Sequence, residues 1–348
     1  MLDKTPSLKN FLEIPYDQLE EMNLKAKEKQ QTVGIKELEA EYRLYLQKEK
    51  RIKAVTLCFT DIEGRFHMLD YDKKYLLESA SNLTFDGSSI RGFTALHESD
   101  LRLEVDWSSI IWLPSDVFGT GKVIMFADVL HRDRSPYESD FRSQLKILGK
   151  NLKTKEGISA YTATETEGFL VEGIGAEQNF DEDIGFKLIS TGGYYHSLPL
   201  DRLRRFIDAS AEAQRAMGFK NEKDHPEVAP SQFELNYGYT EVVRSCDQIQ
   251  LYKLVCRQVA NNMGMTAIFL PKPIANINGS GMHTNFSLGK NGKNIHWAWP
   301  LECDYDATPL DGERGGEASA GPIATSSRVK DACSRPSAST RTFLRARG

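Results

Sequence analysis

The chain has 348 residues, of which 40% are hydrophobic and 27% are charged, and its formal net charge is -5. These values are ordinary for a globular protein of one large domain or two smaller ones, and they give no reason to expect nucleic-acid binding. Five cysteines without a C-x-x-C pair favour a reduced setting and exclude the usual cysteine metal site.

Residues 1–50 are predicted to form a helical N-terminal extension. The first residues carry charges and prolines where a signal peptide needs an apolar core, and no apolar run reaches the roughly 18 residues of a membrane helix. We therefore expect a cytoplasmic protein without membrane contact. The helical stripe in this segment consists of Ile35, Leu38, Tyr42, Tyr45 and Leu46. It can pack on its own domain or contact a neighbouring subunit, and the sequence leaves both open.

Residues 51–150 are predicted to form a small mixed domain of short strands. The segment "IKAVTLCFTDIEGRF" indicates a strand, a turn at Glu63 and Gly64, and a second strand, and "KVIMFADVL" indicates a third. In "NLTFDGSSIRGF", Asp-Gly-Ser-Ser is typical of a turn in which glycine takes backbone angles that other residues avoid. A plain surface turn anchored by its apolar neighbours explains this segment as well as a functional loop does.

Residues 151–300 alternate strand-like runs with two helices. The first helix is expected from about Asp201, as N-cap, to Met217, with Gly218 at its C-terminal end. The second is expected from about Asp247 to Met263, followed by Gly264. Its buried stripe is predicted to contain Ile249, Tyr252, Val255, Cys256 and Val259.

The segment "YTATETEGFLV", residues 161–171, is predicted to be a strand with two chemically different faces. One face carries Tyr161, Ala163, Glu165, Glu167, Phe169 and Val171, and the other carries Thr162, Thr164, Thr166, Gly168 and Leu170. Two carboxylates thus share the more apolar side. An exposed acidic strand face is the simpler explanation, and a cation site is the alternative.

Two later strands show the same division. In "SQFELNYGY", one face suits a core and carries Phe233, Leu235, Tyr237 and Tyr239, and the polar face carries Gln232, Glu234 and Asn236. In "GMHTNFSL", the core face is predicted to hold Met282, Thr284, Phe286 and Leu288, and the polar face His283, Asn285 and Ser287.

The carboxylates and the imidazole of these segments are candidate metal ligands. They are Glu165, Glu167, Glu227, Glu234 and His283. If these groups converge, they repel one another without a cation, and their oxygen-rich set suits Mg²⁺ or Mn²⁺ better than Zn²⁺. His283 can instead be a hydrogen-bonded structural histidine. Gly279 and Gly281 precede it and indicate either a close backbone approach to a ligand or a bulge.

Residues 301–348 differ from everything before them. Arg, Ser, Ala, Gly and Pro dominate, and large apolar residues are sparse. Such a composition predicts a disordered or aberrant tail. The abrupt change near residue 300 favours a truncation or a shifted reading frame over a divergent domain end.

Several motifs, in order, resemble those of bacterial-type glutamine synthetase. "LTFDGSSIRGF" resembles the family's N-terminal aspartate loop, "TETEGFL" its G-P-E-P-E-F-F strand, and "EVAPSQFEL" its E-V-A-P-G-Q-x-E-I segment. "DQIQLYKLVCRQVANNMGMTAIFLPKPI" resembles the family helix and its M-P-K-P end, and "NGSGMHTNFSL" resembles N-G-S-G-M-H-x-x-x-S-L. The order makes the match far more specific than any one motif.

The resemblance implies roles for matched residues. Glu167, Glu227 and Glu234 would hold one Mg²⁺ or Mn²⁺ ion, and Glu165 with His283 part of a second. Asn278 and Gly279 would contact the substrate L-glutamate. The positions of the nucleotide, ATP as co-substrate, correspond to Glu222, Tyr239, Asn285 and Ser287. Asp86 matches the aspartate that binds ammonium from a neighbouring subunit and would take its proton.

The resemblance also implies a fold and an assembly. The fold class would be α+β, with a small β-grasp domain followed by a larger, C-terminally incomplete catalytic domain whose curved antiparallel sheet is flanked by helices. Subunits would form a homo-oligomer of stacked rings, with a dodecamer as the expected size, and share active sites at their interfaces. The implied reaction joins ammonia to the side-chain carboxylate of glutamate through γ-glutamyl phosphate.

The chain departs from the family pattern in places. Thr166 replaces the proline between the paired glutamates, only one of the histidines before Glu227 is kept, as His225, and Asn285 replaces a histidine. The family's later arginines, mobile loop and last metal carboxylate have no counterpart that can be placed. Two other functions therefore stay open: a non-catalytic protein of the same fold, and a ligase of glutamate with another amine.

Overall fold

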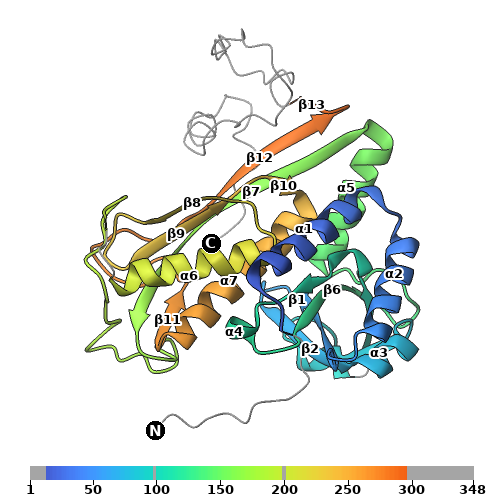
Figure 1. The fold of residues 1–348 in the computed structure, drawn as a ribbon, viewed down its shortest axis with the longest axis horizontal. Helices are drawn as coiled ribbons and strands as arrows, with labels where there is room; N and C mark the ends of the chain where they lie inside the picture. Colours follow the sequence, from blue (N-terminus) through green and yellow to red (C-terminus); the bar gives the residue numbers. More distant parts are fainter. Residues whose placement is uncertain (1–12, 97–98, 198–200, 296–348) are drawn as a thin grey trace.

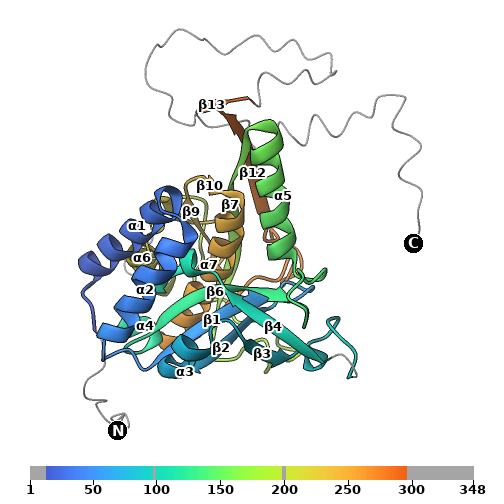
Figure 2. The same ribbon diagram turned by 90° about the vertical axis from the view of Figure 1, so that its right-hand side faces the viewer.

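Two β-sheets organise the part of the chain that the structure describes, which is residues 13–96, 99–197 and 201–295 of a computed structural model (Figures 1 and 2). The tail expected from residue 301 lies outside these residues. The smaller sheet belongs to the N-terminal half and the larger sheet to the C-terminal half. They share a core, because buried residues of the smaller sheet, such as Cys58 and Phe126, pack with Tyr252 and Phe206 of the larger unit.

The N-terminal extension forms two helices, α1 (Tyr16–Thr32) and α2 (Ile35–Lys48). The predicted stripe lies on α2, where Leu38, Tyr42 and Leu46 are buried in the core of the smaller unit, although Ile35 is exposed. Helix α1 lies between the two units. Its buried Asn23 side chain donates to the carbonyl oxygens of Trp112 at 3.0 Å and Ala216 at 2.8 Å. These bonds join α1 to both halves of the chain.

The smaller sheet is mixed, with a parallel pair, β1 and β6, at its centre. Its order is β2-β1-β6-β4-β3, and β5 pairs with β6. The predicted hairpin is confirmed: Gly64 takes a φ of 74° in the turn between β1 and β2. The strands are β1 (Ala54–Thr60), β2 (Phe66–Asp72), β3 (Leu83–Asp86), β4 (Asp100–Val105), β5 (Ile111–Trp112) and β6 (Val123–Leu130). Short helical segments between them are α3 (Lys73–Ser79), η1 (Gly87–Ser89), η3 (Trp107–Ser109) and α4 (Ser115–Phe118).

The larger sheet is antiparallel and is built around the long strand β7 (Ile158–Glu172). Its order is β13-β12-β7-β9-β8, and β10 and β11 also pair with β7. The other strands are β8 (Asn221–Pro226), β9 (Gln232–Tyr237), β10 (Thr240–Glu241), β11 (Met265–Ile268), β12 (Met282–Lys290) and β13 (Lys293–Asn294). Since four strands pair with β7 along its length, side chains from distant segments meet on it.

Three helices accompany the larger sheet (Figure 1): α5 (Phe141–Glu156), α6 (Arg202–Ala216) and α7 (Val242–Asn262). The prediction for α6 is confirmed, because the Asp201 carboxylate accepts from the Arg204 amide and Gly218 follows with a φ of 73°. The predicted start of α7 is wrong. The helix begins at Val242 with Glu241 as its N-cap, while Asp247 is inside the helix and bound to Arg142.

The main core lies on the threonine face of β7, contrary to the expected assignment of its apolar side. Thr162, Thr164 and Thr166 are buried there, whereas Glu165 and Glu167 are only half-buried. Helix α7 covers the threonine face, and the Tyr252 hydroxyl donates to the Thr166 carbonyl at 2.7 Å. On the glutamate face, a smaller cluster around Phe169 and Val171 is buried at one end of the strand.

The expected core face of β12 is also wrong. Met282 and Phe286 are 52% and 42% exposed, while Ser287 on the polar face is 4% exposed. The helices of the larger unit pack against β7, β8, β9 and β11. Strand β12 is on the other side of β7 from β9, next to the short edge strand β13. The polar residues of β12 are on the same face of the sheet as Glu165, and they pair there with Glu165, Ala163 and Tyr161 of β7. In β9 the predicted division holds, since Phe233 and Leu235 belong to the main core.

A buried ionic network ties the two units together. The Arg142 guanidinium on α5 donates to Asp106 at 2.9 Å and Asp128 at 2.6 Å, and to both carboxylate oxygens of Asp247 at 2.8 Å. Lys146 also binds Asp106 and Asp128. Each carboxylate thus has a cationic partner, which is what buried charges require.

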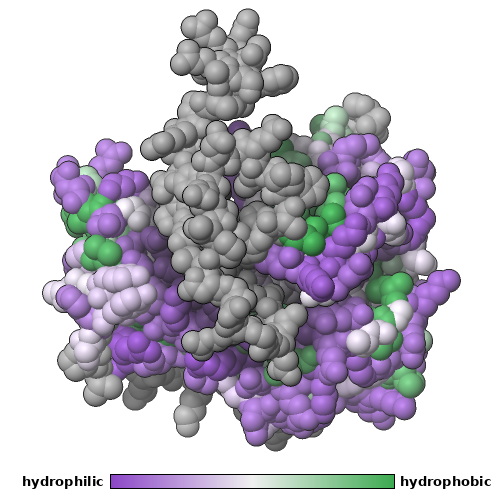
Figure 3. All heavy atoms as spheres, turned by 90° about the horizontal axis from the view of Figure 1, so that it is seen from above, coloured by the Kyte–Doolittle hydropathy of each residue, from purple (hydrophilic) through white to green (hydrophobic). Residues whose placement is uncertain are grey.

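None of the described helices combines the length and the apolar character that a membrane crossing requires. The face shown in Figure 3 is mainly hydrophilic wherever residues are coloured, and its apolar residues form small separate patches.

Candidate functional site

The two glutamates of β7 lie side by side on the half-buried face of the sheet, and each is held by polar partners. Glu165 pairs across the sheet with His283 on β12, and the imidazole Nδ1 is 3.6 Å from the carboxylate. Asn285 donates to the other Glu165 oxygen at 3.0 Å. The Glu167 carboxylate accepts from the Gln232 amide at 3.0 Å and from the Gly281 backbone N–H at 3.1 Å. Both carboxylates are therefore fixed in direction.

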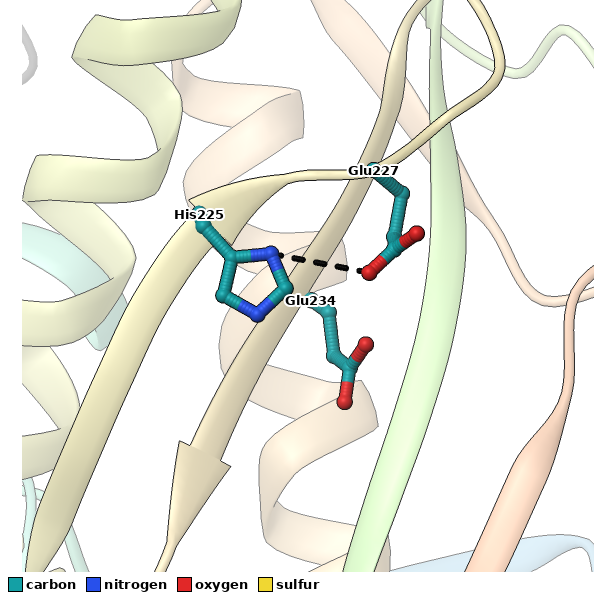
Figure 4. A group of neighbouring side chains, drawn as sticks. All are labelled: His225, Glu227 and Glu234. Carbon is teal, nitrogen blue, oxygen red and sulfur yellow. Dashed lines mark ion pairs between the residues drawn. The ribbon is translucent and has the colours of Figure 1, made fainter. Parts of the chain in front are cut away.

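The hairpin of β8 and β9 brings a second group of ligand atoms to the same face. Glu234 lies opposite Glu167 on one side and opposite His225 on the other. Ligand atoms of His225, Glu227 and Glu234 all lie within 4.8 Å of one another, and the three residues are buried (Figure 4). His225 Nδ1 is 3.5 Å from a Glu227 oxygen. The positive φ of Ser231, 61°, lets the chain turn sharply between Glu227 and Glu234.

Electrostatics at this group favour a bound cation. Burial raises the pKa of Glu234 to about 8, and the neighbouring carboxylates of Glu227, Glu165 and Glu167 add to the rise. Without a cation, the raised pKa favours a protonated Glu234 that is hydrogen-bonded to Glu227. A divalent ion would replace that proton and remove the repulsion, so the donor set of carboxylate oxygens and imidazole nitrogens fits Mg²⁺ or Mn²⁺.

The five predicted ligands are therefore brought to one face of the larger sheet, in two neighbouring groups. Glu165 and His283 form one group, and Glu227 with Glu234 forms the other, with Glu167 between them. Both glutamates of β7 are half-buried and hydrogen-bonded, which favours a cation site over a fully solvated acidic face.

Two residues of the site were not predicted as ligands or ligand partners. His225 was noted only as the one histidine kept before Glu227, yet it is one of the three members of the buried group. Its position opposite Glu234 would have identified it if the β8–β9 hairpin had been predicted. Gln232 was placed on the polar face of β9, where it joins Glu167 to the Gly279 carbonyl, 3.0 Å from its amide nitrogen.

A pair of tyrosines borders the site and was also missed. The ring of Tyr195 lies 4.6 Å from that of His225 at 80°, and the Tyr194 hydroxyl donates to Tyr195 at 2.8 Å. This hydrogen bond, with burial and the charge of nearby Glu227, raises the pKa of Tyr194 to about 12. The segment can lie this close because Gly192 has no side chain: a Cβ there would be 2.7 Å from the Ala229 carbonyl oxygen.

The residues matched to glutamate binding lie on the loop before β12. Asn278 is exposed, and Gly279 packs so closely on the chain that a Cβ would lie 2.5 Å from the Pro271 carbonyl oxygen. A Cβ at Gly281 would lie 3.3 Å from a Glu167 oxygen. Both glycines therefore serve a close backbone approach, the first to another loop and the second to the candidate metal ligand.

The residues matched to nucleotide binding lie on two separate strands. Asn285 and Ser287 follow His283 on the same face of β12. Glu222 is exposed on β8, with a carboxylate oxygen 3.0 Å from where a Cβ of Gly238 would be, so it is next to the segment that carries Tyr239. Asn285 and Ser287 therefore share a face of β12 with His283, whereas Glu222 lies on β8 beside the segment of Tyr239.

Asp86 is at the end of β3 in the smaller sheet, away from the larger sheet that carries the carboxylates. Its carboxylate is exposed and accepts from the Ser88 and Ser89 hydroxyls at 2.6 Å and 2.7 Å, which lowers its pKa. The expected special backbone angles of Gly87 are absent. Its lack of a side chain matters because a Cβ would lie 2.7 Å from Leu101.

Comparison with known families and proteins agrees with this architecture. The family model described as "Glutamine synthetase, beta-Grasp domain" matches residues 51–132, and "Glutamine synthetase, catalytic domain" matches residues 138–298. The chain is 38% identical over 270 residues to glutamine synthetase of Methanosarcina mazei and 34% identical over 271 residues to that of Thermus thermophilus. These matches cover 75% and 76% of this chain, but 58% and 59% of the relatives, so the chain spans little more than half their length.

A solved structure shows the same fold. Glutamine synthetase of Plasmodium falciparum superposes with a TM-score of 0.64 at 24% sequence identity, over 74% of this chain and 55% of that one. The predicted fold, a β-grasp domain followed by a catalytic domain with an antiparallel sheet and helices, is confirmed.

Proposed function

The chain belongs to the glutamine synthetase family, and from that premise we propose that it acts in the ATP-dependent ligation of ammonia to the side-chain carboxylate of L-glutamate, giving glutamine. One observation carries the proposal beyond the family: the carboxylates of Glu165, Glu167 and Glu234 meet on one face of the larger sheet, with two imidazoles beside them. A reaction between two anions, a nucleotide phosphate and a carboxylate, needs such a concentration of cation ligands.

We assign one divalent ion to Glu167, Glu227 and Glu234, and part of the site of a second to Glu165 and His283. When bound, Mg²⁺ or Mn²⁺ would neutralise and align the reacting phosphoryl and carboxylate groups. The protein contributes fixed ligand directions, through the bonds of Gln232 and Gly281 to Glu167. The raised pKa of Glu234 supports this assignment, since the site is electrostatically unsatisfied without positive charge.

Glutamate is assigned to Asn278 and Gly279, and ATP to Glu222, Tyr239, Asn285 and Ser287. In support, the Gly279 carbonyl is joined through Gln232 to Glu167, so a substrate held at this loop would be next to the ligand pair. Asn285 already contacts Glu165, so a nucleotide phosphate near β12 would be beside the second ion.

Ammonium is assigned to Asp86, acting on the site of a neighbouring subunit. Its carboxylate is exposed and charged, which is the form that attracts a cation and that can accept a proton. Asp86 lies in the smaller sheet and the candidate metal ligands lie in the larger one, so the assignment requires the homo-oligomer of stacked rings that the family resemblance implies. We propose the same domain division, 51–150 and 151–300, and a cytoplasmic location.

The test measures two products. Purified chain receives glutamate, ATP, Mg²⁺ and ammonium, and glutamine and phosphate are followed together. Equal release of glutamine and phosphate is expected. Folded protein that forms no glutamine above background would refute the ligase and leave a non-catalytic protein of this fold, and product with another amine but not ammonium would point to the alternative ligase.

Two variants test the assignment of the site. Glu167→Gln keeps the shape of the side chain but removes a ligand charge, so it should abolish glutamine formation. Glu172→Gln is the matched control, because Glu172 ends the same strand and its contacts are exposed ion pairs with Lys187 and Arg202. Full activity in the first variant, or equal loss in both, would contradict the assignment.

A further inference from the structure

A cavity of about 40 Å³ lies between the two units, where α1, the turn η3, strand β6 and α7 meet. None of the candidate metal ligands lines it. Its polar lining residues are Lys27, Gln30, Ser108, Ser109, Arg244, Asp247 and Gln248. The helix α1 that supplies Lys27 and Gln30 precedes residue 51, where the first family match begins. The cavity is therefore not a feature of the matched domains alone.

Two cations line this cavity without a carboxylate of their own. Lys27 donates to the Gly218 carbonyl at 2.5 Å and lies 5.1 Å from the ring centre of Phe219. The one hydrogen bond described for the Arg244 guanidinium goes to the Lys27 carbonyl at 3.2 Å. Asp247 is the only acidic residue in the described lining, and both its oxygens already accept from Arg142 at 2.8 Å.

A buried amide in the same lining also lacks a partner. Gln248 is 7% exposed, and within the described residues its side chain makes no hydrogen bond. Buried amides in folded proteins are nearly always hydrogen-bonded, so the unpaired amide of Gln248 is free to bind a water molecule or an ion in the cavity that it borders. Its NH₂ group adds a donor to the ammonium and the guanidinium.

The mutual repulsion of Lys27 and Arg244 also favours a negatively charged occupant of the cavity. Burial, followed by the charge of Arg244, lowers the pKa of Lys27 to about 7. Burial lowers the pKa of Arg244 as well, although the carboxylates of Glu241, Asp106 and Asp247 act in the opposite direction. A negative charge between the two groups would remove the penalty that each pays for its charged form in a partly buried place.

We propose that this cavity binds one small inorganic anion of the size of chloride, held by Lys27, Arg244 and the amide of Gln248. The cavity volume of about 40 Å³ has room for an ion of this size. The bound ion joins α1 to α7 and lies beside η3 of the smaller sheet, so it strengthens the contact between the two units. A halide site at this seam is independent of the proposed ligase chemistry.

The experiment uses chloride as the probe and the whole chain as the protein. Line broadening in ³⁵Cl NMR is titrated with protein, and thermal unfolding is compared in sodium chloride and sodium gluconate at equal ionic strength. Saturable broadening and a higher unfolding temperature in chloride are expected. Arg244→Gln should weaken chloride binding about tenfold or more, because it removes a charge-assisted donor.

Arg257→Gln is the matched control, since it removes the same charge from the exposed side of α7 and should leave chloride binding unchanged. Gln248→Leu removes the unpaired amide while keeping a similar volume, so it should weaken chloride binding without unfolding the chain even if Arg244→Gln proves unstable. Folded wild-type chain that shows no saturable chloride binding, or the same chloride binding in Gln248→Leu and Arg257→Gln as in the wild type, would overturn the proposal.

Discussion

Replacing Glu234 by glutamine should stabilise the metal-free chain at alkaline pH, although it removes a proposed metal ligand. The pKa of Glu234 rises from its ordinary value of 4.5 to about 8 in the folded chain. A raised pKa means that the folded state favours the protonated carboxyl. Its contribution to stability is complete below about pH 4.5 and is lost as the pH rises through about 8.

The size of the effect follows from the two pKa values. At ~1.4 kcal/mol per pKa unit, their difference sets an upper limit of about 5 kcal/mol. Glu165 and Glu167 are only half-buried, so solvent screens part of the repulsion, and we expect about 2 kcal/mol at pH 8.5. The glutamine amide can donate to Glu227 in place of the lost proton, so the variant keeps that hydrogen bond at every pH.

Urea unfolding in EDTA at pH 4 and pH 8.5 measures the difference between variant and wild type. The variant should match the wild type at pH 4 and exceed its free energy of unfolding by about 2 kcal/mol at pH 8.5. Saturating Mn²⁺ should reverse the order, because only the wild type gains the binding energy of the ion. A variant less stable than the wild type at both pH values in EDTA would refute the electrostatic account of the site. Glu172→Gln should show no such pH dependence.

Three further changes test the packing that holds the site in place, each by urea unfolding. Asn23→Ala removes three buried hydrogen bonds of α1 and should cost about 2–3 kcal/mol; a loss under 1 kcal/mol would mean that α1 does not hold the two units together. Arg142→Met leaves three buried aspartates without their guanidinium and should lower the free energy of unfolding by about 3–5 kcal/mol. The loss should be larger above pH 6 than at pH 4, and a loss independent of pH would contradict the ionic explanation. Gly279→Ala would put a Cβ 2.5 Å from the Pro271 carbonyl oxygen and should cost about 1–3 kcal/mol, with weaker Mn²⁺ binding; unchanged stability and binding would show that the loop can shift freely.

Local signals were sufficient for elements whose ends are set by their own residues. The turn at Gly64 and the cap of α6 at Asp201 are examples, because a positive φ and an N-terminal carboxylate act within a few residues. The start of α7 shows the limit of such signals. Asp247 has the side chain of an N-cap, but its carboxylate is bound by Arg142, 105 residues earlier in the chain. No local pattern reveals that partner.

Which face of each strand is buried was harder to predict, because it too depends on segments that are distant in the sequence. Alternation correctly separated the two sides of β7, but it could not show which side the helices cover. The answer depends on α7, which begins 70 residues after the end of β7 and packs on the side where Thr164 and Thr166 are buried despite their hydroxyls. The Thr164 hydroxyl tolerates this burial because it is 2.8 Å from the Tyr237 hydroxyl. Residue type alone would have left it at the surface.

The candidate site depends both on local sequence patterns and on contacts between distant strands. Each ligand could be named from its strand, but no single strand showed that the ligands meet, and His225 was missed because its role depends on lying opposite Glu234. In the structure, Glu234 on β9 is paired with residues of both neighbouring strands. It lies opposite Glu167 on β7 and opposite His225 on β8. A cation bound at Glu234 would therefore fix three strands relative to one another. The negative charge of these carboxylates destabilises the site without a cation, and the same charge would hold the strands in place once a cation is bound.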